Sequence, residues 1–206
     1  MTDDGWFRNA DWNDAIAGSF EQKLKRARRK SQYLRIQACT LASSHPQVAL
    51  ELLERYFALG EDFDHAQAHV DRAKAHLALG DLGAAIQSYE AALERELAFP
   101  NLRTNAYLDL PYVIALNGVV SRFDQALTIL SGSEDRLMFP VDRFKYHAAK
   151  AVILARSDST AARGEANAAL EAAALDHSGF RYHPTVGLVS ERHAQALSKL
   201  RGLCDA

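Results

Sequence analysis

Hydrophobic residues recur along the chain at intervals of three and four, the spacing that puts side chains on one face of an α-helix. One such stripe runs through residues 20–41, and a shorter one runs through residues 48–57 after the turn at His45-Pro46. No stretch alternates apolar and polar residues between turn residues, as a half-buried strand would. The pattern predicts an all-α protein of helices joined by turns, with a single long first helix over residues 20–41.

The clearest unit of this pattern runs from about Ala66 to Pro100. Small residues recur in it on both sides of a Gly-Asp turn, and an aromatic residue and a closing proline follow. The residues that carry the pattern are Ala73, Gly80, Asp81, Ala85, Tyr89, Ala92 and Pro100. The unit resembles a tetratricopeptide repeat, in which two helices pack closely through small residues. Gly80 supplies the left-handed conformation that ends the first helix of the pair.

Weaker copies of this unit extend the resemblance over residues 30–172. Ala49, Ala85, Ala126 and Ala162 align with one another at intervals of 36, 41 and 36 residues, close to the family period of about 34. Phe-Pro dipeptides at 99–100 and 139–140 recur in the same register, each ahead of an expected first helix. Pro111 lies inside the third first helix and is expected to kink or restart it. A helical bundle without a period is the alternative interpretation.

The resemblance implies a right-handed α-solenoid of about four degenerate helix pairs with capping helices at both ends. The whole chain, 1–206, then forms one domain: an N-terminal segment (1–18), the helical repeats (19–172), and a loop with a capping helix (173–206). The family binds peptides or proteins in a concave groove built from the first helices. The groove candidates are Leu34, Arg35, Val70, Asp71, Lys74, Leu108, Tyr112, Phe144 and His147. A homodimer, or the chain's own segments Trp6–Trp12 or Phe180–Tyr182, are the alternative occupants of the groove.

Charge is distributed unevenly along the chain. Residues 22–50 hold seven cations and no acidic residue, whereas the rest of the chain holds 17 cations and 26 anions. A basic patch is predicted on the first helix from Lys23 onward, formed by Lys25, Arg26, Arg28, Arg29 and Arg35. A solvated helix face is the plain interpretation of this patch. An acidic protein partner is the favoured functional interpretation, and nucleic acid is less favoured because binding it needs many phosphate contacts.

The composition limits the class of protein but does not indicate a particular reaction or ligand. The 206 residues are 48% hydrophobic and 24% charged with a net charge of −2, which is ordinary for a globular domain. Two distant cysteines, Cys39 and Cys204, form no disulfide framework and indicate a reducing compartment. The N-terminus lacks the features of a signal peptide, and no apolar run is long enough to cross a membrane. These observations predict a cytoplasmic protein with no membrane attachment.

Motifs that carry catalytic or cofactor chemistry are not found in the sequence. It contains no Gly-rich phosphate loop, no nucleophile elbow and no HExxH helix. His65, His69 and His76 share one helix face, but the third lies too far along the axis to join a tetrahedral metal site with the others. The sequence therefore predicts a non-enzymatic protein without a metal or cofactor.

Overall fold

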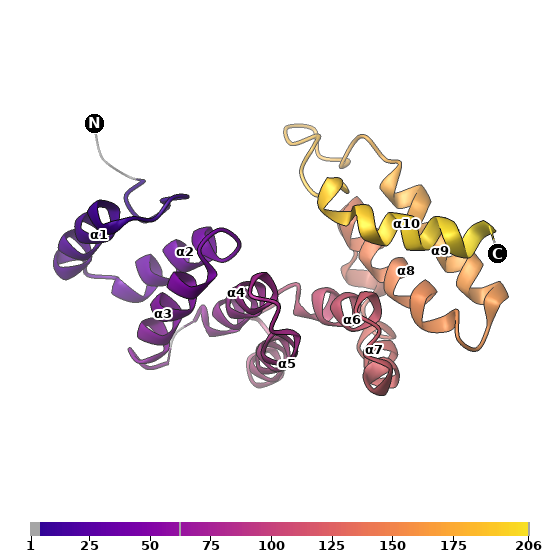
Figure 1. The fold of residues 1–206 in the computed structure, drawn as a ribbon, viewed down its shortest axis with the longest axis horizontal. Coiled ribbons are helices and arrows are strands. Elements are labelled where there is room, and N and C mark those ends of the chain that lie inside the picture. The colour runs from indigo at the N-terminus through magenta and orange to yellow at the C-terminus, as the bar shows by residue number, and fades with distance from the viewer. Residues whose placement is uncertain (1–4, 62, 206) are drawn as a thin grey trace. The chain divides into compact units, whose positions relative to one another are not determined.

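The computed structural model describes residues 5–61 and 63–205, and all regular structure in these ranges is helical. The chain forms two compact units, Met1–Ala106 and Tyr107–Ala206. The first unit contains α1 (Asp14–Arg26), α2 (Lys30–Leu41), α3 (Pro46–Phe57), α4 (His65–Ala78) and α5 (Leu82–Ala98). The second contains all but the first residue of α6 (Ala106–Leu116), then α7 (Phe123–Leu130), α8 (Pro140–Leu154), α9 (Ser159–Ala173) and α10 (Ala194–Asp205). Short 3-10 helices lie at Val120–Arg122, Glu134–Arg136 and Glu191–His193 (Figure 1).

Pairs of successive helices pack together as the repeat pattern predicts. Helix α2 packs on α3, α4 on α5, and α8 on α9. Four aligned alanines each stand at the fourth position of α3, α5, α7 and α9, and each is buried: Ala49, Ala85, Ala126 and Ala162. A side chain this small lets the backbones of two helices approach closely. The four alanines thus occupy equivalent positions of four helices, while the repeat family and the stacking of the pairs into a solenoid stay predictions.

The turn between α4 and α5 has the geometry expected from its sequence. Gly80 has a φ of +77°, a conformation that costs glycine little because it has no Cβ. The Asp81 carboxylate then caps α5 by accepting a hydrogen bond from the Ala84 N–H at 2.9 Å. Ala73 and Ala92 are fully buried in this helix pair, and Tyr89 is buried with them.

The single long first helix predicted from the sequence is wrong. Helix α1 ends at Arg26 and α2 begins at Lys30, because the backbone is extended at Ala27, where ψ is 138°. Five of the six residues from 25 to 30 are cations, and one continuous helix would hold them on adjoining turns, where they repel one another. Because α1 ends at Arg26, its last turn holds Lys23, Lys25 and Arg26 at the negative end of the helix dipole, where positive charge is stabilising.

Residues 6–12 of the N-terminal segment pack on their own unit. The Trp6 ring contacts Phe20 of α1 and Tyr33 of α2, with ring centroids 5.4 and 4.8 Å away. Gln37 is fully buried because its side chain accepts hydrogen bonds from the Asn9 backbone and side-chain N–H groups and donates to the Asn9 carbonyl. These contacts attach the segment to α1 and α2.

The predicted C-terminal capping helix is present and packs on α8 and α9 (Figure 1). Ala196 and Leu200 of α10 are buried in one cluster with Phe144 of α8 and the alanines of α9. Lys199 of α10 also donates a hydrogen bond to the Leu116 carbonyl at the end of α6. Helix α10 therefore covers a face of the second unit that the groove hypothesis leaves open.

Two expectations that rest on prolines differ from the structure. Pro111 lies inside α6, which continues as one helix from Ala106 to Leu116. The two Phe-Pro dipeptides also differ in place, because Phe99 follows the last residue of α5 whereas Phe139 precedes the first residue of α8. Their recurrence therefore does not mark equivalent positions of a repeat.

Among residues 5–61 and 63–205, no helix combines the length and the apolar character that crossing a bilayer requires.

Candidate functional site

Most of the apolar groove candidates are core residues. Leu34, Val70, Leu108 and Phe144 are each at most 3% exposed, so none of them is available to a partner. The assignment of these residues to an open groove is wrong because their side chains are buried. Leu34 packs in one cluster with α1 and α3, and Phe144 packs beneath α10.

Three charged groove candidates do come together, around a buried carboxylate. Asp71 of α4 is fully buried and accepts hydrogen bonds from Arg35 of α2 at 3.2 Å and from Gln67 at 3.0 Å. Lys74 lies 3.9 Å from the same carboxylate and is exposed. Burial acts most strongly on the pKa of Arg35 and lowers it, but the charges of Asp64 and Asp71 and the hydrogen bonds to them together outweigh burial, and the pKa is raised. This cluster joins α2 to α4, and the guanidinium of Arg35 is occupied by its ion pairs with Asp64 and Asp71.

Tyr112 and His147, the remaining groove candidates, make contacts within the second unit. Tyr112 is half-buried, with its ring 6.2 Å from Phe144 and 6.4 Å from His193. Burial raises the pKa of Tyr112 to about 12. His147 pairs through Nδ1 with Glu165 of α9 at 2.6 Å, and Lys150 pairs with the same carboxylate at 2.5 Å. Both residues therefore hold helices of the second unit together.

Two of the three histidines of α4, His65 and His69, pack against the same ring, that of Phe57. His65 contacts the Gly60 carbonyl through Nε2 at 2.9 Å, and the His69 ring stacks on Phe57 with centroids 4.7 Å apart. Burial lowers the pKa of His69 to about 4 and also lowers that of His76. Within residues 5–61 and 63–205, no three His, Cys, Asp or Glu side chains gather in a way that could hold a metal ion.

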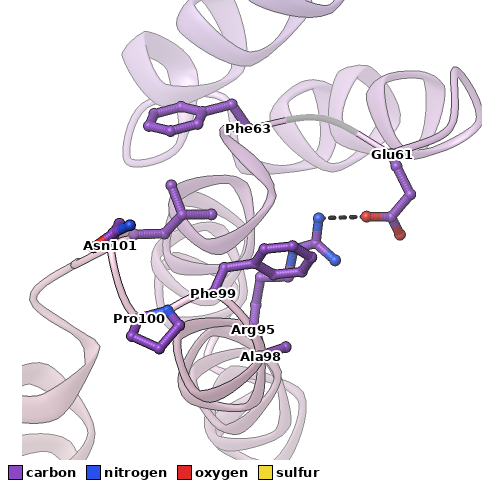
Figure 2. A pocket seen from close by; sticks show the side chains of 8 residues that line it. Glu61, Phe63, Arg95, Ala98, Phe99, Pro100 and Asn101 are labelled. Atoms are coloured by element: carbon purple, nitrogen blue, oxygen red, sulfur yellow. Dashed lines mark ion pairs between the residues drawn. The ribbon is translucent and has the colours of Figure 1, made fainter.

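The surface with the character of a binding site lies where the end of α5 meets the loop between α3 and α4. A pocket of about 660 Å³ is lined there by Glu61, Phe63, Arg95, Ala98, Phe99, Pro100, Asn101 and Leu102. Phe63 is 74% exposed and Phe99 is 45% exposed. Figure 2 shows the two rings on different walls of the pocket. Exposed aromatic residues gathered around a hollow usually mark an interaction site.

The ion pair between Glu61 and Arg95 adds charge to this apolar pocket (Figure 2). The Arg95 guanidinium lies 4.0 Å from the centre of the Phe99 ring and pairs with Glu61, whose side chain is 74% exposed. The Arg95 Nε is buried and has no hydrogen-bond partner among residues 5–61 and 63–205. The pocket thus offers an aromatic wall with a cation stacked on it, and that cation pairs with a solvent-exposed carboxylate.

Local hydrogen bonds hold the loop that carries Phe99. Leu102 donates its N–H to the Phe99 carbonyl at 2.8 Å, closing a turn. Glu96 of α5 then accepts from both the N–H and the hydroxyl of Thr104, at 2.8 and 2.5 Å. A loop ordered before binding costs less entropy to immobilise when a ligand arrives. The pocket is therefore preorganised.

None of the pocket residues belongs to the groove set predicted from the sequence. Phe99-Pro100 is visible there only as a repeated dipeptide, and nothing in the linear pattern shows that Phe63 stays uncovered. The antiparallel packing of α4 on α5 decides the site, because it places the loop before α4 beside the end of α5.

The residues of the predicted basic patch divide into two groups. Lys25, Arg26, Arg28 and Arg29 are exposed at the junction of α1 and α2. Arg35 is not part of this surface, because it pairs with Asp64 and Asp71.

We predict that acid weakens both units through one histidine in each, the half-buried His69 and the buried His193. Burial, as the largest cause, lowers the pKa of His69 in the first unit and of His193 in the second to about 4. The unfolded chain, with a histidine pKa near 6.5, binds protons more readily than the fold does, so stability falls as pH drops from about 6.5 toward 4. Each histidine is expected to remove about 2 kcal/mol of unfolding free energy between pH 7.5 and pH 5.

Urea unfolding of wild type, His69→Gln and His193→Gln at several pH values measures this effect. Each substitution should reduce the slope of stability against pH between 6.5 and 5. Slopes identical to that of wild type in both variants would show that other groups bind the protons.

Comparison of the chain with protein-family models, with curated proteins and with solved structures finds no match in any of the three. The resemblance to tetratricopeptide repeats therefore stays a prediction from the residues.

Proposed function

We propose that the chain is a non-catalytic interaction module that binds a peptide or protein segment in the pocket at the end of α5. The observation that carries the proposal is the exposure of Phe63 and Phe99 on the walls of a preorganised hollow. Burying one such ring contributes about 1.5–3 kcal/mol. An apolar side chain of the partner is the anchor, and Arg95 attracts an acidic group beside it.

The repeat pattern implied peptide or protein binding, and the proposal keeps that function. It places the binding in the pocket at the end of α5 instead of the predicted groove. The original groove residues are core, whereas the pocket at the end of α5 lies on the surface. The partner is a protein or peptide, and homodimerisation through the same pocket is the alternative. A cytoplasmic setting is part of the proposal, since both cysteines are free thiols.

Peptide display tests the proposal. Peptides selected on wild type are expected to carry an aromatic or branched apolar residue and to bind the Phe63→Ser/Phe99→Ser variant at least about tenfold more weakly, because the anchor loses its walls. Their affinity should persist in 0.5 M salt, since salt does not weaken apolar burial as it weakens surface electrostatics.

Tyr182→Ser is the matched control, because Tyr182 is 79% exposed and belongs to the other unit. Unchanged unfolding curves would show that all variants remain folded. Selected peptides that bind the double variant as well as wild type would contradict the proposed site.

A further inference from the structure

Positively charged side chains are concentrated on the surface at the junction of α1 and α2. Lys25, Arg26, Arg28, Arg29 and Lys30 are all exposed. No ion pair in the described part of the chain involves any of these five residues. The acidic residue best placed to neutralise them along α1, Glu21, pairs instead with Arg55 at 2.6 Å. We call these five residues the basic junction.

A hollow beside α1 lies in line with the basic junction. Its volume is about 300 Å³, and its lining includes Trp6, Ile16, Ser19, Phe20 and Lys23. Residues three and four apart share a helix face, so Ile16, Ser19 and Lys23 form one row along α1, and Arg26 is the next residue of that row. The hollow, lined by both apolar and polar side chains, thus lies one helical turn before the first cations of the junction.

We infer that the basic junction and this hollow together bind an acidic protein segment that carries an apolar side chain. Carboxylates of the segment pair with the cations, and the apolar side chain enters the hollow beside Trp6 and Phe20. The inference concerns a second surface, distinct in residues and chemistry from the pocket at the end of α5.

The aromatic residues beside the junction favour a protein segment over nucleic acid. Single-stranded nucleic acid is held by open aromatic faces on which bases stack. The Trp6 ring already packs against Phe7, Phe20 and Tyr33, with centroids 5.5, 5.4 and 4.8 Å away. The cations also span only six residues, a short track for successive phosphates.

Fluorescence anisotropy with the full chain and a labelled 12-residue peptide, glutamate throughout except for one central phenylalanine, tests the inference. Binding in 50 mM salt should weaken at least about tenfold in 500 mM salt, because the contacts are between exposed charges. Arg28→Glu/Arg29→Glu should weaken binding in 50 mM salt at least about tenfold relative to wild type. A serine in place of the phenylalanine should weaken binding severalfold, and so should Ser19→Trp, which fills the hollow.

Arg156→Glu/Arg163→Glu is the matched control, since it makes the same charge change at exposed positions of the second unit. It should leave the affinity within about twofold. An equal loss in this control, or no binding by wild type, would overturn the inference. Tighter binding of a 12-nucleotide oligo-deoxythymidine would assign the surface to nucleic acid instead. Binding that occurs only in Asp3→Asn/Asp4→Asn would make the chain's own N-terminus the occupant, although those residues lie outside the described ranges.

Discussion

Leu108→Arg is expected to unfold the second unit. Leu108 of α6 is 1% exposed, so the substitution forces a long charged side chain into a buried position. Forcing such a charge into a close-packed core costs more than about 4 kcal/mol, a large part of the stability of a domain of this size. The same substitution in a groove residue would leave the fold intact and affect only binding.

Urea unfolding followed by circular dichroism measures the effect. Val120→Arg is the control in the same unit, because Val120 is 47% exposed and should accept the charge with little loss. If the Leu108→Arg protein has the same urea midpoint of unfolding as wild type, Leu108 lies on the surface and is again a groove candidate.

Asp71→Ala is expected to destabilise the first unit by about 3–5 kcal/mol. Asp71 is fully buried, and its removal leaves the guanidinium of Arg35, only 17% exposed, paired with the more exposed Asp64. The loss arises from the buried counter-charge that the guanidinium loses more than from the intrinsic strength of the ion pair. Urea unfolding at neutral pH measures it.

Two further variants separate these contributions. Asp64→Asn removes the outer, more exposed carboxylate and should cost less than about 1 kcal/mol. Arg35→Met/Asp71→Leu removes both buried charges and should recover most of the stability lost in Asp71→Ala. A double variant as unstable as Asp71→Ala would show that packing around the pair, and not its charge, supports the unit.

The helix pairs could be predicted from the sequence because their signals are local. Gly80 and Asp81 end one helix and begin the next through their own backbone conformation and side-chain capping. Ala49, Ala85, Ala126 and Ala162 mark equivalent positions of four helices because only small residues allow close helix packing. These signals require no knowledge of distant contacts.

The candidate binding surfaces could not be predicted in the same way. The apolar face of a helix is visible in sequence, but the segment that covers it is not. Phe144 lies beneath α10, which comes more than 40 residues later, whereas Phe99 remains 45% exposed. Both are phenylalanines of apolar stretches, and only their tertiary neighbours distinguish a core residue from a binding residue.

The sequence by itself therefore determined an all-helical chain, the register of its helix pairs and the concentration of positive charge in residues 25–30. Each follows from spacing, turn residues or composition within a short stretch of chain. The tertiary structure alone decided the break between α1 and α2, the burial of Asp71 beside Arg35, and the exposure of Phe63 and Phe99 around one pocket. Burial and charge pairing depend on which distant residues meet, and that contact is a property of the folded chain.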